Sequence, residues 1–461
     1  MTMLTNRSSI DVAPSPGAPA APPRSVQTGA HPNAVLAAIG AGALAAIWLW
    51  WRNTGAISGL GDWLTNAGRV TGLLAGYGVV VLVALMARIP PLERGIGADK
   101  LARWHAKGGR YTVSLITAHA LLIIWGYSIT GHTNVISQSG TLVMSYPDVL
   151  MATVGGLLFI GVGAVSARAA RRRMRYETWY YLHLYTYLAI ALAFSHQFAT
   201  GAEFIDNRLA RVVWSAMYAV VGAAILWYRV VVPVRQTLRH RLRIQDVYPE
   251  GPGVVSIVIE GKHLDELGAQ AGQFFRWRFL TRELWWASNP YSLSAAPAGG
   301  TLRITVKALG EHSAALVRLR PGTRVYAEGP YGAMTAVRRR QRKVLLIAGG
   351  IGITPLRALF EELPGEVALL YRAHQDADVV FRQELGVIAA RRGARLHVVT
   401  GSRAQLGWDP LSPVVLTANF PDLSSYDVYV CGPEGMAQAV VAALRAAKVP
   451  RRQIHHESFE F

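Results

Sequence analysis

Residues 180–198 read YYLHLYTYLAIALAFSHQF, an apolar and aromatic stretch with His183 near its start and His196 near its end. A helix needs about 20 mostly apolar residues to cross a bilayer. Ionisable side chains inside such a helix are costly and are usually retained for a function. The stretch therefore predicts a membrane-spanning helix whose function depends on two imidazoles.

Residues 103–127, RWHAKGGRYTVSLITAHALLIIWGY, hold a second pair of histidines, His105 and His119, which are 14 residues apart. This separation corresponds to about 21 Å along a helix. Both rings share one face, because 14 steps of ~100° end within about 40° of the start. His183 and His196 are 13 residues apart, which places His196 about 140° around a straight helix from His183. A bulge, a tilt or staggered partners are therefore needed before both can face one neighbour.

Six apolar stretches are long enough to cross a membrane, in agreement with a hydrophobic content of 51% and a mean hydropathy of +0.24. The loops at 88–110 and 168–175 are rich in Lys and Arg, whereas the loop at 131–147 has neither. Basic loops stay in the cytoplasm, so we expect a protein of the plasma (inner) membrane with its N-terminus and C-terminal half in the cytoplasm. The same clusters explain the net charge of +19 without nucleic acid as a partner, membrane lipid being the expected surroundings. The expected spans are 34–51, 70–87, 108–130, 149–167, 180–199 and 211–233.

Both histidine-bearing spans run outward from the cytoplasm, so the rings are expected to pair by depth. His105 then faces His183 near the inner surface, and His119 faces His196 near the outer one. Two imidazoles that face each other across a helical bundle are the ligand set of a six-coordinate haem iron. Four histidines at matched depths thus predict two haems in series. The alternative is that they are interfacial or hydrogen-bonded core histidines.

The chain changes character after the last span. Short alternating segments between 240 and 335, such as VVSIVIEG and LRITVKAL, are typical of an antiparallel barrel. From Lys343 onward, strand-like runs alternate with helix-like runs, which indicates a parallel sheet covered by helices. The only cysteine, Cys431, excludes an intrachain disulfide.

With these elements placed, the sequence resembles the ferric reductase and NADPH oxidase superfamily, in particular prokaryotic NADPH-oxidase-like members. The histidine spacings of 14 and 13 and the segments quoted below carry the resemblance. It implies a six-span membrane α-helical bundle with two b-type haems, a cytoplasmic antiparallel β-barrel that binds FAD, and an α/β parallel-sheet domain that binds NADPH. The expected domains are a disordered cytoplasmic tail at 1–32, the membrane bundle at 33–235, the barrel at 236–337 and the nucleotide domain at 338–461.

The barrel carries two segments similar to the flavin-binding stretches of this family. NPYSLSAAP, 289–297, resembles a stretch in which Arg or His precedes Pro, an aromatic residue and Ser or Thr. Tyr291 would lie against the isoalloxazine and Ser292 would hydrogen-bond it, but Asn289 cannot supply the family's cation. VKALGEHSAAL, 306–316, resembles the segment that closes over the flavin phosphates; ordinary turns of a β-domain are the alternative for both. The implied flavin contacts are Asn289, Pro290, Tyr291, Ser292, Val306, Lys307 and Ser313.

Two further segments resemble the nicotinamide site of ferredoxin reductases. LLIAGGIGITPLRALF, 345–360, places a glycine-rich turn between a strand and a helix, where backbone N–H groups can approach a pyrophosphate. CGPEGM, 431–436, resembles the segment whose cysteine lies close to the nicotinamide, although Cys431 could equally be a buried small apolar residue. The implied nucleotide contacts are Gly349, Gly350, Gly352, Thr354, Pro355, Cys431, Gly432 and Pro433.

The segment TGSRAQ, 400–405, resembles the Ser-Arg segment that NADP-linked reductases place at the 2′-phosphate. Arg recognises phosphate through charge-assisted bidentate contacts. Arg372, Ser402 and Arg403 therefore favour NADPH over NADH, the alternative for Arg403 being a solvated loop charge. Phe461 resembles the terminal aromatic residue that shields the flavin in the family, unless it is a plain strand residue.

The resemblance implies that electrons pass from cytoplasmic NADPH through FAD and two haems to an acceptor outside, either O2, giving superoxide, or ferric iron. Arg69 resembles an arginine near the outer haem of the oxidases, where it would favour an anion or pair with a propionate, unless it is an interfacial arginine. The candidate catalytic residues are Arg69, Cys431 and Phe461. Two alternatives stay open: a reductase for a periplasmic or membrane redox partner or a quinone, and a non-redox transporter with an accessory nucleotide domain.

Overall fold

The computed structural model describes residues 29–171, 173–174, 176–298 and 300–456. This part of the chain forms two compact units: a helical unit made of Gly29–Ile96 and Lys100–Val230, and a second unit that contains the chain from Val231 onward. Most of the expected tail at 1–32, and Phe461, lie outside the described residues.

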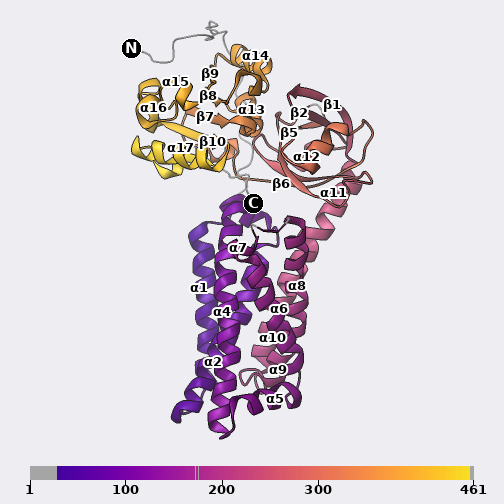
Figure 1. The fold of residues 1–461 in the computed structure, drawn as a ribbon, viewed down its shortest axis with the longest axis vertical. Helices are drawn as coiled ribbons and strands as arrows, with labels where there is room; N and C mark the ends of the chain where they lie inside the picture. Colours follow the sequence, from indigo (N-terminus) through magenta and orange to yellow (C-terminus); the bar gives the residue numbers. More distant parts are fainter. Residues whose placement is uncertain (1–28, 172, 175, 299, 457–461) are drawn as a thin grey trace. The chain divides into compact units, whose positions relative to one another are not determined.

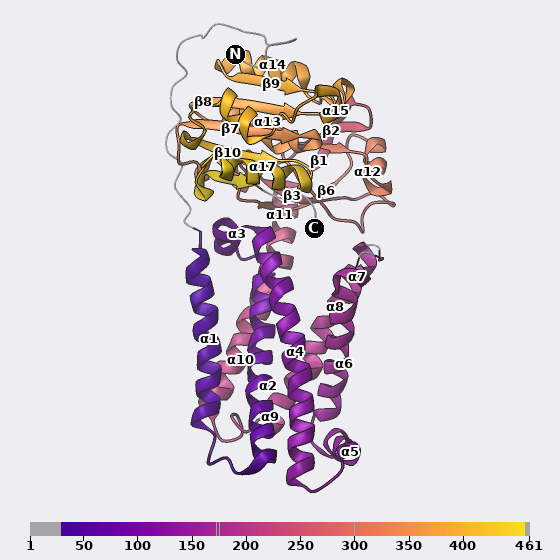
Figure 2. The same cartoon turned by 60° about the vertical axis from the view of Figure 1, so that its left-hand side comes forward.

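Long apolar helices make up the first unit, in which α1, α2, α4, α6, α8 and α10 lie side by side along one direction (Figure 1 and Figure 2). Their outward faces carry exposed apolar side chains such as Trp48, Leu157 and Val220. Exposed apolar surface on this scale suits lipid rather than water. The helices that lie in this unit or reach into it are α1 (Pro32–Arg52), α2 (Gly59–Leu85), α3 (Pro90–Ile96), α4 (Ala98–Thr130), α5 (Val135–Ser145), α6 (Val149–Ser166), α7 (Arg168–Arg171), α8 (Tyr176–Phe194), α9 (His196–Thr200), α10 (Arg208–Leu226) and the π-helix η1 (Trp227–Val231); α11 (Val232–His240) follows in the second unit.

Five of the helices in the described residues are long and apolar enough to cross a membrane. They correspond to five of the six expected spans. The stretch expected at 180–199 falls on α8 and α9, neither of which is among the five. The sixth span therefore stays a prediction. The five candidate spans are Pro32–Arg52, Gly59–Leu85, Lys100–Thr130, Val149–Ser166 and Arg208–His240.

The helix that carries His183 ends before it reaches His196. α8 ends at Phe194, Ser195 forms a turn, and the short helix α9 begins at His196. The sequence left a bulge, a tilt or staggered partners as the ways to bring both rings to one neighbour. The structure has a one-residue interruption at Ser195, whose backbone keeps right-handed helical angles, and the ring centre of His196 lies 6.4 Å from that of His119.

Glycines on α2 allow α4 to approach closely. Gly68, Gly72 and Gly76 recur every four residues and therefore share one face of α2. An added Cβ at Gly68 would lie 2.9 Å from the side chain of Ile123, and one at Gly72 would lie 2.7 Å from Nδ1 of His119. Small residues at this spacing let membrane helices pack backbone against side chain, and here they bring α2 against a candidate ligand.

The second unit begins with two antiparallel sheets of three strands each, in the orders β1-β2-β5 and β4-β3-β6. Isolated bridges join Arg243 to Arg324 and Leu293 to Ile304, and so connect the two sheets. Trp277 and Phe279, fully buried between the sheets, belong to one apolar core. The antiparallel strands that the sequence predicts are thus present, while closure into a barrel stays a prediction. The strands are β1 (Arg243–Gly251), β2 (Val254–Glu260), β3 (Phe274–Phe279), β4 (Asn289–Ser292), β5 (Thr301–Lys307) and β6 (Val325–Tyr331), with α12 (Glu311–Ala315) after β5.

A parallel five-stranded sheet follows, in the order β11-β10-β7-β8-β9. Its central strands are mostly apolar, as expected when helices cover both faces, and a separate apolar core lies on each face. The parallel sheet predicted from Lys343 onward is confirmed. Its elements are β7 (Lys343–Gly349), α13 (Ile353–Glu362), β8 (Glu366–Arg372), α14 (Arg382–Arg392), β9 (Arg395–Val399), α15 (Arg403–Leu406), α16 (Pro413–Asn419), β10 (Tyr426–Cys431), α17 (Glu434–Ala446) and β11 (Ile454–His456).

Candidate functional site

The four histidines of the helical unit lie as two facing pairs. The ring centres of His105 on α4 and His183 on α8 are 5.8 Å apart. Those of His119 on α4 and His196 on α9 are 6.4 Å apart. Two imidazoles on opposite sides of one metal ion would have centres roughly 6 Å apart, because each metal–nitrogen bond is ~2 Å and each ring adds its own radius. The spacing of both pairs fits a shared metal.

One nitrogen of each ring is already engaged by the protein. The Nδ1 atoms of His105, His119 and His196 lie 3.1, 2.8 and 2.5 Å from the carbonyl oxygens of Leu82, Gly68 and Ala193 respectively. Nδ1 of His183 lies 3.3 Å from the hydroxyl of Ser166. A ligating histidine usually donates its second N–H in this way, which fixes the tautomer and leaves Nε2 for the metal. The four rings are held as haem ligands would be.

A cavity of about 570 Å³ lies beside the second pair, and both His119 and His196 line it. This volume is within the ~300–1,000 Å³ typical of pockets for organic ligands. Its walls are mainly apolar, and the polar side chains among them include Arg69, Glu203 and Tyr127. A haem, which is flat and apolar apart from two propionates on one edge, suits such a lining. The pair of His119 and His196 therefore has both the ligands and the space that a haem would need.

Arg69 is paired within the helical unit. Its guanidinium lies 2.6 Å from the carboxylate of Glu203 and donates a further hydrogen bond to Asn66. The side chain of Glu203 is 3% exposed, so this buried carboxylate would be costly without the charge of Arg69. Arg69 lies on α2 one residue after Gly68, the residue whose carbonyl engages His119, and Glu203 follows α9. The ion pair thus joins the two segments that hold the outer rings.

The flavin-like segment forms an edge of the second antiparallel sheet. Asn289, Pro290, Tyr291 and Ser292 make up β4, which pairs with β3. The backbone carbonyl of Tyr291 accepts a hydrogen bond from the indole N–H of Trp277 at 2.9 Å, and burial raises the pKa of the Tyr291 phenol. A neutral phenol ring held from its backbone can present a flat face, as contact with an aromatic cofactor requires.

The second flavin-like segment is engaged differently from the expectation. Val306 is buried in the core of the sheets. Lys307 forms an ion pair with Asp378 at 3.3 Å. The hydroxyl of Ser313 accepts hydrogen bonds from the backbone N–H groups of Leu309 and Gly310, and so closes the turn before α12. Lys307 and Ser313 therefore hold local structure, and a phosphate role for either stays a proposal.

The glycine-rich turn and the CGPEGM segment meet at one edge of the parallel sheet. β7 and β10 are neighbours that run parallel, so the residues after their carboxyl ends come together. An added Cβ at Gly352 would lie 2.4 Å from the carbonyl oxygen of Cys431, and one at Gly432 would lie 3.1 Å from Cα of Gly349. The chain order reverses between these two strands, and ligands of parallel α/β sheets bind at such switch points.

The other residues expected to contact the nucleotide shape the backbone at this end of the sheet. Gly350 has a φ of +53°, which suits glycine. Thr354 and Pro355 are buried in the first turn of α13, where the hydroxyl of Thr354 donates to the carbonyl of Ile351. Pro433 is the residue before α17. These residues shape the turn and place helix N-termini at the sheet edge.

Cys431 is fully buried at the end of β10 and belongs to the apolar core on one face of the sheet. Its side chain has the environment of a small apolar residue. The alternative weighed from the sequence therefore describes its packing, while a place beside a nicotinamide stays a proposal.

The candidate 2′-phosphate residues cluster after β8 and β9. Arg372 donates hydrogen bonds to the carbonyl oxygens of Val399 and Gly401, and burial lowers its pKa, as does the nearby guanidinium of Arg403. The hydroxyl of Ser402 caps α15 by accepting from the N–H of Gln405. Arg403 is 64% exposed and pairs with Asp409 at 3.0 Å. Arg372 thus holds the loop after β9 through the backbone carbonyls of Val399 and Gly401. Ser402 and Arg403 are the residues of this group that an incoming anion can reach.

Comparison with known proteins identifies both halves of the chain. Residues 71–194 match the family described as "Ferric reductase like transmembrane component", and residues 346–442 match the "Oxidoreductase NAD-binding domain". The chain is an oxidoreductase with a ferric-reductase-like membrane component and an NAD-binding domain. The first match includes His105, His119 and His183 and ends two residues before His196.

Curated proteins that are similar to part of the chain include two ferredoxin reductases. The ferredoxin reductase component of 3-ketosteroid-9-alpha-monooxygenase from Mycobacterium tuberculosis is 31% identical over 198 residues, which cover 41% of this chain and 54% of the relative. Ferredoxin--NADP reductase B from Sorangium cellulosum is 29% identical over 37% of this chain and 77% of its own. The chain thus spans about half the length of the first of these relatives.

Two solved structures are similar to part of the chain. The flavohem-like FAD/NAD binding domain of nitric oxide dioxygenase from Vibrio cholerae is 25% identical, with a TM-score of 0.38 over 47% of this chain and 97% of that chain. The ferredoxin reductase of carbazole 1,9a-dioxygenase is 23% identical, with a TM-score of 0.39 over 48% of this chain and 69% of that chain. The family matches and the curated relatives, taken together, show a membrane component followed by a ferredoxin-reductase-like module for FAD and NAD(P)H.

Some functional candidates were not found from the sequence. Glu203 carries no motif, and only the structure pairs it with Arg69. The contact of Gly72 with His119 had a visible signal, since the glycines of α2 recur every four residues. A cluster of Arg303, Arg357 and Glu384 in the second unit also had no sequence signal, because its members lie on three separate elements.

Proposed function

We propose that the chain carries electrons across a membrane, from cytoplasmic NADPH through FAD and two bis-histidine haems to an acceptor on the far side. The observation that carries the proposal is the state of the four imidazoles: each Nδ1 is engaged by a protein oxygen, and the rings face each other in two pairs. Interfacial or hydrogen-bonded core histidines would not be expected to face each other in two pairs with Nδ1 engaged in every ring.

The proposal gives the protein residues the tasks of holding and orienting. His105 and His183 would hold the inner haem, and His119 and His196 the outer one. When bound, FAD would accept a hydride from NADPH and supply electrons singly to haem iron. The turn at Gly349–Gly352 would bind the pyrophosphate, and Tyr291 would lie against the flavin ring.

The preference for NADPH rests on Ser402 and Arg403. The hydroxyl that caps α15 and the exposed guanidinium beside it offer donors at a helix N-terminus, where a phosphate is well accommodated. Arg372 supports this loop through the carbonyl of Gly401. The proposal also places Cys431 beside the nicotinamide and Phe461 against the flavin.

The acceptor is proposed to be O2 or ferric iron. Arg69 lines the outer cavity, but Glu203 already compensates its charge. Arg69 would therefore act on an acceptor or a propionate through hydrogen bonds rather than as a free cation. The chain would lie in the plasma membrane with its reductase module and N-terminus in the cytoplasm.

The test is a visible spectrum of the detergent-purified chain before and after NADPH, with and without air. We expect a haem Soret band with two haems per flavin, reduction by NADPH without air, and reoxidation by air or by a ferric chelate. A colourless protein would overturn the proposal in favour of a transporter. Reduced haem that neither oxidant reoxidises would replace the proposed acceptor with a redox protein or a quinone.

A further inference from the structure

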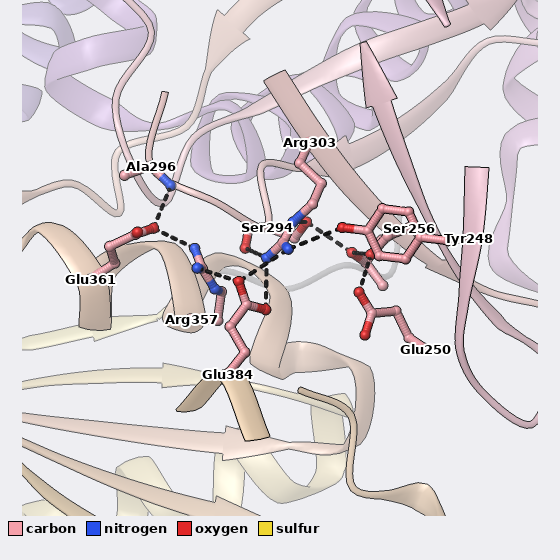
Figure 3. Close-up of polar contacts among 10 residues, drawn as sticks. Tyr248, Glu250, Ser256, Ser294, Ala296, Arg303, Arg357, Glu361 and Glu384 are labelled. Carbon is pink, nitrogen blue, oxygen red and sulfur yellow. Dashed lines mark hydrogen bonds and ion pairs between the residues drawn. The ribbon is translucent and has the colours of Figure 1, made fainter. Parts of the chain in front are cut away.

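A charged cluster joins the antiparallel sheets to the parallel-sheet domain within the second unit. Figure 3 shows Arg303 and Arg357 on either side of Glu384. Arg303 lies on β5, Arg357 on α13 and Glu384 on α14. These elements belong to the flavin-like and the nucleotide-like parts of the module, so the cluster bridges the two candidate cofactor sites.

Glu384 is the centre of the cluster. Arg303 approaches it with both terminal nitrogens, each 3.1 Å from a different carboxylate oxygen. Arg357 donates to the same carboxylate at 2.5 Å. Bidentate Arg–carboxylate contacts fix orientation as well as distance. One carboxylate thus sets the positions of two arginines from different parts of the module.

Each arginine is held on its own side as well. Arg303 donates to the hydroxyl and the carbonyl of Ser294 at 3.1 and 2.9 Å, and its guanidinium lies 5.0 Å from the ring centre of Phe381. Arg357 pairs with Glu361 on α13, and Glu361 accepts a hydrogen bond from the backbone N–H of Ala296 at 3.2 Å. The contacts therefore cross between the two parts at more than one point.

Burial makes these contacts costly to break. The side chains of Arg303 and Arg357 are 13% and 5% exposed. Removing one charge from such a network leaves its partner desolvated and uncompensated. The two arginines and the two glutamates balance in charge, so the cluster holds together without an external ion.

The cluster lies close in the chain to each candidate cofactor segment. Ser294 comes two residues after Ser292 of the flavin-like stretch. Arg357 comes two residues after Pro355, in the helix that the glycine-rich turn begins. A shift of β5 or of α13 would therefore move a cofactor segment.

We propose that Arg303, Glu384 and Arg357 are positioning residues for hydride transfer, because they fix the flavin-binding strands relative to the nicotinamide-binding helix. The proposal rests on the proposed function. Hydride transfer depends steeply on the distance and alignment of donor and acceptor. A cluster that fixes this geometry influences the rate of transfer without touching either cofactor.

The test compares Glu384→Gln with Glu366→Gln in the purified full chain. The first change removes the central charge and keeps the shape, and the second makes the same change at an exposed position on β8. Flavin reduction by NADPH is followed by stopped flow without air. For Glu384→Gln we expect the saturating rate to fall about tenfold to a hundredfold, because a misplacement of ~1 Å can cost up to about 10²-fold. The KM for NADPH, flavin content and reduction by dithionite should stay near those of the wild type, and Glu366→Gln should match the wild type throughout.

A second variant and an isotope measurement separate positioning from folding. Arg303→Lys keeps the charge but loses the bidentate contact, so it should fall between the wild type and Glu384→Gln. Deuterium at C4 of NADPH should slow both variants more than it slows the wild type. A rate that falls only in proportion to lost flavin or to a lower Tm would overturn the inference, as would an unchanged rate beside a normal wild type. A wild-type flavin that NADPH does not reduce would overturn the proposed function itself.

Discussion

The two units of the molecule hold their candidate sites by different means. In the helical unit, backbone carbonyls fix three of the four imidazoles and a face of glycines brings α2 against His119. In the second unit, charged side chains such as Arg303 and Glu384 join the parts of the site. The difference follows from the surroundings: unpaired charge is costly among lipid-facing helices, whereas backbone dipoles are present in every helix. The helical unit thus places its rings mainly through close backbone approach, with the compensated ion pair of Arg69 and Glu203 beside them.

The largest expected effect is the loss of a ligand in the helical unit. His119→Leu should remove the outer haem, halving the haem content per flavin, while NADPH still reduces the flavin because the second unit is unchanged. The measurement is haem content by the pyridine method together with flavin reduction without air. His132→Leu, at an exposed histidine outside the two pairs, should keep both haems. Full haem content and full transmembrane electron flow in His119→Leu would contradict the assignment.

The next largest effect is expected at Gly352. An added methyl group would lie 2.4 Å from the carbonyl oxygen of Cys431 and 2.7 Å from Cα of Gly432. Both are backbone atoms, which cannot move aside as a flexible side chain can. Gly352→Ala should therefore lower the free energy of unfolding by an amount near the upper end of the roughly 1–3 kcal/mol known for overpacking. It should also weaken NADPH binding. Chemical unfolding of the full chain gives the first quantity and NADP⁺ titration the second. Gly386→Ala on α14, where an added Cβ meets nothing within 4 Å, should stabilise slightly; equal effects at the two positions would contradict the close approach.

A smaller effect is expected from the same change in the helical unit. Gly72→Ala would place a Cβ 2.7 Å from Nδ1 of His119. Because a ring can turn where a backbone cannot, we expect the fold to survive and the spectrum of the outer haem to change. The measurement is low-temperature electron paramagnetic resonance, which reports the relative orientation of axial imidazoles. Gly222→Ala, with open space around its Cβ, should leave the spectrum of both haems as in the wild type.

The smallest effect is a dependence of stability on pH in the second unit. Asp427 is fully buried, and although burial alone raises its pKa, hydrogen bonds from His455 and from the N–H groups of Gln341 and Arg340 lower it overall. A carboxyl whose folded pKa lies below the unfolded value of about 3.9 stabilises the fold above that pH, and the stabilisation is lost as the pH falls through the folded pKa. The Tm of the full chain should therefore drop below about pH 4. Asp427→Asn should be less stable at pH 7 and should lack that part of the decline; a variant with the wild-type pH profile would contradict the role of Asp427.

The sequence predicted the elements that depend on the pattern of residues within one stretch of chain. Apolar length predicted six spans, and five of them correspond to helices that are long and apolar enough to cross a membrane. Matched depth on two spans predicted which rings meet. Alternation predicted the antiparallel strands and the parallel sheet. Contacts between distant segments had no such signal. Nothing in the sequence connects Arg69 with Glu203, or Arg303 with Glu384, because each pair is brought together only by the packing of separate elements. The sequence also could not show that Lys307 and Arg372 are engaged by the protein itself.

Ser195 separates α8 from α9 but keeps right-handed helical backbone angles, with φ −67° and ψ −36°. A residue inserted between His183 and His196 would therefore rotate the second ring by ~100° relative to the first. The length of this segment is thus constrained as closely as the identity of its two histidines. Homologous chains should accept substitutions between the two rings more readily than insertions or deletions.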